Sequence, residues 1–125
     1  MARRSPAECD GMIEVEIPIK TVSEANMREH WGVKHGRQIL QSNAVAYGLF
    51  PYRTEIAEFK LPLAISFTRI GKRELDSDNL QSAFKKIRDK VAAILSVNDG
   101  DKQIKWDYQQ EKGSRYAIRI KVEQL

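Results

Sequence analysis

The chain has 125 residues, of which 42% are hydrophobic and 30% charged, and this composition fits an ordinary soluble globular protein with one core. Its net charge of +4 favours an anionic partner without requiring one. Because it has no bilayer-length apolar run, no apolar stretch behind its N-terminal arginines and only one cysteine, we expect a cytoplasmic protein without signal peptide, internal disulfide or membrane contact.

The first half of the chain predicts a tail, a strand and a helix. Residues 1–11 mix proline, glycine and charge, which is typical of a flexible tail before a single domain at 12–125. From Ile13 to Ile19 apolar and polar residues alternate, which predicts a strand. Pro18 indicates that this strand either lies at a sheet edge or ends near this proline. The spacing from Glu24 to Gly48 is helical, with breaks expected at two glycines. The residues expected to face inward are Trp31, Ile39, Leu40 and Val45.

The second half predicts a strand, a helix and two more strands. Leu61 to Ile70 is apolar on both faces, so we expect a central strand that begins after Pro62, and residues 51–56 form a connector before it. A helix is expected to begin at Asp78. Its buried stripe would be Leu80, Phe84, Ile87, Val91, Ile94 and Leu95. Two strands, one on each side of Gly113, would form a hairpin.

The order of these elements is strand, helix, strand, helix, strand, strand. We therefore expect an α+β fold, with a mixed sheet of about four strands and two helices on one face.

Two pairs of acidic residues flank the second helix. Asp76 and Asp78 precede it, and Asp99 and Asp101 follow it. Carboxylates are ligands that Mg²⁺ prefers, and Mg²⁺ activates water and neutralises phosphate in phosphodiester hydrolysis. Taken singly, Asp78 is also typical of a helix cap and Asp99 of a turn, whereas Asp76 has no capping role in this interpretation. The helix is about 25 Å long at ~1.5 Å per residue, so the pairs meet only if the chain after Leu95 returns along it.

Several cationic residues lie close to the acids in the sequence. Arg69, Lys72 and Arg73 precede Asp76 and would hold phosphates beside the one that is cut, although a solvated loop explains them equally well. A second DNA-contacting surface, or simply a wet helix face, would include Arg28, Lys34, His35 and Arg37.

The stretch DSDNL…NDGDKQI resembles the signature of the RusA family of Holliday-junction resolvases. That signature is Asp-x-Asp-Asn, a helix, and then an acidic pair followed by one residue, a glutamine and an aliphatic residue. The matching residues are Asp76, Asp78, Asn79, Asp101, Gln103 and Ile104. The segment NMREHW at 26–31 is similar to the start of the family's first helix, and Lys112 to a basic position after the acids. The likeness spans roughly Ile13 to Val122.

Two positions depart from the family pattern. Ser82 stands where the family usually has a lysine, and Lys85 and Lys86 follow one helical turn later. Gly100 separates two acids that are adjacent in the family.

The resemblance implies a homodimer, of bacterial or phage origin, that resolves four-way junctions in branched double-stranded DNA during recombination and repair, with Mg²⁺ or Mn²⁺ as cofactor. The expected metal ligands are Asp76, Asp78, Asp99 and Asp101. The expected catalytic residues are Asp76, Asp78 and Asp101, with Lys85 or Lys86. The expected DNA contacts are Arg69, Lys72, Arg73, Asn79 and Lys112. Two alternatives stay open: a non-catalytic DNA-binding protein on the same fold, and a protein-interaction module whose acids bind a basic partner.

Overall fold

The structure is a computed structural model that describes residues 11–21 and 31–125, and in this part of the chain four strands form one mixed sheet in the order β1-β4-β2-β3. The strands are β1 (Met12–Ile17), β2 (Leu63–Gly71), β3 (Ile104–Lys112) and β4 (Ala117–Gln124). Strand β4 is antiparallel to both β1 and β2, whereas β2 and β3 are parallel. The predicted α+β fold with a mixed sheet is confirmed, as are the edge position of the first strand and the central position of the second.

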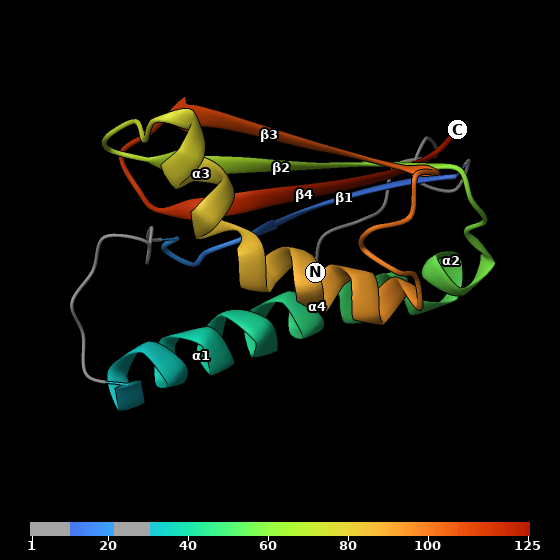
Figure 1. The fold of residues 1–125 in the computed structure, drawn as a ribbon, viewed down its shortest axis with the longest axis horizontal. Coiled ribbons are helices and arrows are strands. Elements are labelled where there is room, and N and C mark those ends of the chain that lie inside the picture. Colours follow the sequence, from blue (N-terminus) through green and yellow to red (C-terminus); the bar gives the residue numbers. More distant parts are fainter. Residues whose placement is uncertain (1–10, 22–30) are drawn as a thin grey trace.

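The helices pack on one face of this sheet. Helices α1 (Trp31–Leu49) and α4 (Lys85–Leu95) run along its length, and α3 (Ser77–Ala83) crosses it near the end of β2 (Figure 1). Between α1 and β2 lie a short 3-10 helix, η2 (Phe50–Tyr52), and α2 (Arg53–Glu58), where the sequence predicted only a connector. In the described residues no helix is long and apolar enough to cross a bilayer.

The core lies between the sheet and the helices, because alternate residues of each strand face the same side. Phe67 of β2 stacks on Phe84, between α3 and α4, with ring centres 5.1 Å apart, and Trp106 and Tyr108 of β3 extend this aromatic contact. The predicted helix stripe is buried at Leu80, Phe84, Ile87 and Val91 and half-buried at Ile94 and Leu95. Burial of this apolar surface is the main driving force for the fold.

The predicted hairpin between the last two strands is wrong. Strand β4 lies between β1 and β2, and β3 pairs in parallel with the far side of β2. The link from Lys112 to Ala117 therefore passes over the end of β2, where the Gly113 amide donates to the Gly71 carbonyl. A Cβ at Gly113 would lie 2.9 Å from a methyl group of Ile70. The turn signal at Gly113 thus reflects this close crossing and not a hairpin.

The predictions for α1 are partly wrong. The helix continues through both glycines, Gly32 and Gly36, without a break. Val45 is fully buried, but Ile39 is 46% and Leu40 71% exposed, because the inward side of the helix is formed by Gln41, Val45 and Leu49. Three parts of the chain lie outside the described residues: the side chain of Trp31, residues 1–10 of the predicted tail at 1–11, and the segment 22–30, which includes Arg28.

Candidate nucleic-acid and metal site

The carboxyl ends of the parallel strands β2 and β3 lie at the same end of the sheet, since Gly71 pairs with Lys112. Ligands of open α/β sheets bind outside such strand ends. Here the chain leaves β2, passes through residues 72–75 and enters α3, so Asp76 and Asp78 lie at this end (Figure 1). The cations placed at this end by the strand register and its connections are Lys20, Arg69, Lys72, Arg73, Lys112 and Arg115. We call these six cations, together with Asp76 and Asp78, the strand-end cluster. Three other acids, Glu16, Glu74 and Glu111, lie at the same end, and Glu16 is ion-paired with Arg115.

Asp76, and not Asp78, caps the helix. Its backbone is extended (φ −68°, ψ 168°), one carboxylate oxygen accepts from the Asn79 amide at 2.9 Å, and the other accepts from the Asn79 side chain at 3.1 Å. Asp78 already lies in the first turn of α3, so the prediction that Asp76 has no capping role is wrong. Both carboxyl groups are exposed, and the helix start favours negative charge there. This gives the two acids a structural role in addition to any role toward a metal.

Arg69 is buried in β2 and does not lie in a solvated loop. It is only 5% exposed, its Nη1 donates to the Arg73 carbonyl, and burial lowers the pKa of its guanidinium. Its Nε is buried without a hydrogen-bond partner in the described part of the chain. A Cβ on Gly71 would lie 2.9 Å from Nη1, so the glycine makes room for the guanidinium. Lys72, Arg73 and Lys112 are exposed around it.

The second acidic pair lies at the opposite end of the sheet. Leu75, next to Asp76, is hydrogen-bonded to Gln110 near the end of β3, whereas Asp101 precedes Ile104 at its start. Six strand residues, about 20 Å at ~3.3 Å each, separate these two points. Among residues 11–21 and 31–125, no group of three or more histidine, cysteine or acidic side chains lies close enough to hold a metal ion.

The Asp99–Asp101 turn has its own local contacts. The Asp99 carbonyl accepts from Arg88 Nη2 at 2.8 Å and from Trp106 Nε1 at 3.0 Å, and its carboxylate lies 3.9 Å from Arg88 Nε. The Asp101 side chain accepts from the Gln103 amide at 2.8 Å, as in an Asx turn. One chain therefore does not bring the four predicted metal ligands together.

The two predicted catalytic lysines, Lys85 and Lys86, lie in the first turn of α4 and are exposed. Neither forms an ion pair with an acid in the part of the chain that the structure describes. Their role stays a prediction.

The sequence reasoning missed Gln110. Arg69 and Gln110 are partners in the strand register, and both continue the inward-facing row of their strands one step beyond Phe67 and Tyr108. The sequence did offer one indication of its role, because Gln110 is a polar residue at the position where the alternating apolar series Ile104, Trp106 and Tyr108 would continue.

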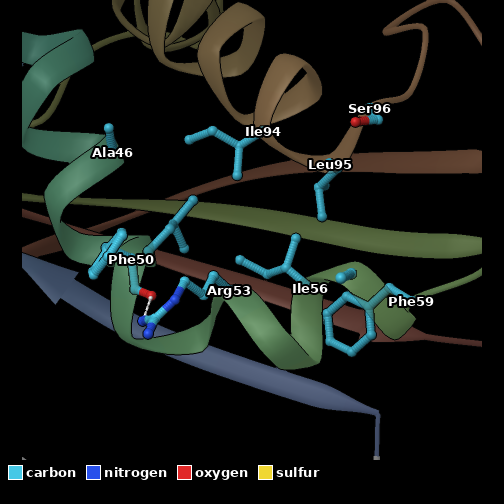
Figure 2. Close-up of a pocket in the computed structure, with 10 residues that line it drawn as sticks. Ala46, Phe50, Arg53, Ile56, Phe59, Ile94, Leu95 and Ser96 are labelled. Atoms are coloured by element: carbon cyan, nitrogen blue, oxygen red, sulfur yellow. Dashed lines mark hydrogen bonds between the residues drawn. The ribbon is translucent and has the colours of Figure 1, made fainter.

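An apolar groove of about 500 Å³ lies at the other end of the helical layer. It is formed by the end of α1, α2 and the end of α4, and Arg53 folds over its rim to donate to the Phe50 carbonyl at 3.1 Å (Figure 2). None of the predicted site residues lines this groove.

No protein-family model and no curated protein matches this chain. The resemblance to the RusA family therefore rests on the motif residues alone.

Proposed function

We propose that the protein is a Mg²⁺- or Mn²⁺-dependent endonuclease that cuts branched double-stranded DNA. The observation that carries this proposal is the strand-end cluster, in which two exposed carboxylates lie among cationic side chains at the ends of parallel strands. Mg²⁺ sites that act on nucleic acids use one or two carboxylates together with the phosphates of the substrate. The donor types at Asp76 and Asp78 fit such an ion.

In this proposal each part of the cluster has a separate task. Asp76 and Asp78 hold the metal, and Asp76 retains acceptor capacity beyond its two hydrogen bonds to Asn79. The bound ion would supply an activated water and neutralise charge on the phosphate. Exposed Lys72 and Lys112 bind neighbouring phosphates and fix the path of the backbone. Lys85 or Lys86 would stabilise charge on the phosphate during cleavage.

We further propose that a second copy of the chain supplies Asp99 and Asp101. On α1, the side chains of Val33, Leu40 and Tyr47 are 58%, 71% and 85% exposed. They lie seven residues apart and so form one exposed apolar stripe along the helix, which we take as the seam between two α1 helices. Helix α1 runs along the length of the sheet, and it begins toward the same end of the molecule as α3, at left in the view (Figure 1). Antiparallel pairing of two α1 helices would therefore turn the Asp99–Asp101 end of one copy toward the strand-end cluster of the other. A two-fold dimer would carry two such sites.

Replacing Leu40 by glutamate is expected to separate this dimer. A charge in the seam opposes pairing. Because Leu40 is exposed within one subunit, the free energy of unfolding of the separated subunit should change by no more than about 0.5 kcal/mol. Analytical ultracentrifugation should show a dimer for the wild type and a monomer for Leu40→Glu. Ala93→Glu, which adds the same charge at an exposed position of α4, is the control and should stay dimeric. A monomeric wild type would rule out the pairing.

Lys72→Gln and Lys112→Gln are each expected to weaken junction binding, because each removes one electrostatic contact with a DNA phosphate. Loss of one phosphate contact should lower the slope of log K against log salt concentration by about 0.9. Binding titrations at several salt concentrations measure this slope. Lys60→Gln removes an exposed lysine just before β2, at the opposite end of the sheet, and should leave the slope unchanged. Equal effects of all three variants would mean that the cluster is not the DNA-binding surface.

The second candidate function is a non-catalytic DNA-binding protein on the same fold. It is favoured by the separation of the two acidic pairs within one chain and by Ser82 in α3. A labelled four-way junction, incubated with and without Mn²⁺, distinguishes the two candidates. Metal-dependent cutting supports the endonuclease, and salt-sensitive binding without cutting supports the DNA-binding protein. Absence of binding at moderate salt would instead favour a protein-interaction module.

A further inference from the structure

The side chain of Gln110 forms hydrogen bonds with both backbone groups of Leu75. Its Oε1 accepts from the Leu75 amide at 2.9 Å, and its Nε2 donates to the Leu75 carbonyl at 2.7 Å. These two bonds satisfy both backbone groups of the residue directly before Asp76. A carboxamide is the side-chain group that offers an acceptor and a donor together in this way.

We propose that Gln110 is a positioning residue, which fixes Asp76 and Asp78 in the geometry that binds the divalent cation. This inference rests on the proposed function. The segment Lys72–Leu75 is tied to the sheet at two points, by Gln110 at Leu75 and by Arg69 at the Arg73 carbonyl. Because Leu75 is held in place, the position of the next residue, Asp76, which has an extended backbone and caps α3, is also fixed.

The contacts of Gln110 suggest an effect on the site that exceeds its effect on the fold. Leu75 also packs against the core, and Leu80 and Phe84 anchor α3 in it. These apolar contacts remain when the carboxamide is removed, so the helix should stay in place while the loop before it gains freedom. Side chains that orient metal ligands without touching the metal typically change metal affinity by about 10- to 100-fold when they are replaced.

The test compares Gln110→Met with Gln109→Met. Methionine keeps the length of the side chain but makes neither hydrogen bond. Gln109 is the preceding residue of β3 and is exposed on the opposite face of the sheet. Mn²⁺ binding to the full-length protein is measured by titration calorimetry. Hydrogen exchange of the Leu75 amide and the thermal unfolding midpoint are measured without metal.

We expect Gln110→Met to weaken Mn²⁺ binding by about 10- to 100-fold, to accelerate exchange of the Leu75 amide, and to melt within a few degrees of Gln109→Met. In the wild type, the Leu75 amide should exchange more slowly than those of Lys72 and Arg73. Three results would overturn the inference about Gln110 but leave the proposed function standing. They are equal Mn²⁺ affinity in the two variants, loss of the fold only in Gln110→Met, and rapid exchange of the Leu75 amide in the wild type. A wild type that binds no Mn²⁺ would overturn the proposed function as well.

Discussion

Asp76→Asn and Asp78→Asn are each expected to abolish cutting of a four-way junction in Mn²⁺ while leaving junction binding intact or stronger. A metal ion contributes several kcal/mol to the transition state of phosphodiester hydrolysis, so loss of a ligand should lower the rate by about 10³-fold or more. Removal of a negative charge from the cationic strand-end cluster should not weaken its binding to phosphate. Single-turnover cleavage and gel-shift titration of the same labelled junction measure the two effects.

The Asp76 variant separates the metal role from the structural role. Asparagine caps helices about as well as aspartate, and its side-chain oxygen would still accept from the Asn79 amide. The free energy of unfolding should therefore stay within about 0.5 kcal/mol of the wild type. Asp89→Asn, at an exposed acid of α4, is the control and should cut normally. If Asp76→Asn cuts as fast as this control, the carboxylate of Asp76 is a cap and not a metal ligand.

Local patterns in the sequence predicted the inward faces of the sheet and of the α3–α4 segment. The strand predicted at Leu61 to Ile70 contains Phe67, the helical stripe contains Phe84, and these two rings do meet in the core. The choice of strand partners was not predictable in this way. In β4 no residue before Gln124 is exposed, whereas β3 is exposed at Lys105, Asp107 and Gln109. This difference suits a central strand and an edge strand respectively. Nearness in the sequence nevertheless suggested that the two would pair.

The parallel pairing of β2 and β3 also explains why the acidic pairs lie apart. A chain that leaves the end of one parallel strand must return to the start of the next, and here α3 and α4 form that crossover. Asp76 begins the crossover and Asp101 ends it, so the two residues lie at opposite ends of the sheet. The sequence motif includes both acidic pairs, but it does not predict whether the strands that flank them are parallel or antiparallel. A hairpin interpretation of the last two strands left this direction undetermined.

Mixing Asp78→Asn with Asp101→Asn is expected to restore cutting, although each protein alone is inactive. In the proposed dimer each site takes Asp76 and Asp78 from one subunit and Asp101 from the other. A mixed dimer then carries one site with both substitutions and one site with none. Random exchange makes half of the dimers mixed, each with one intact site of two, so about a quarter of the wild-type sites should be active. Nicking of a labelled junction after subunit exchange measures this fraction.

The control for this experiment is a mixture of Asp78→Asn with Asp76→Asn. Both substitutions lie in the same half of the site, so every dimer they form lacks an intact site and the mixture should remain inactive. Recovery in the first mixture alone would assign Asp101 to the partner subunit. If neither mixture recovers while the wild type cuts and sediments as a dimer, a second copy does not supply Asp101 to the site. If Asp101→Asn alone cuts like the wild type, the metal is held by Asp76 and Asp78 without Asp101.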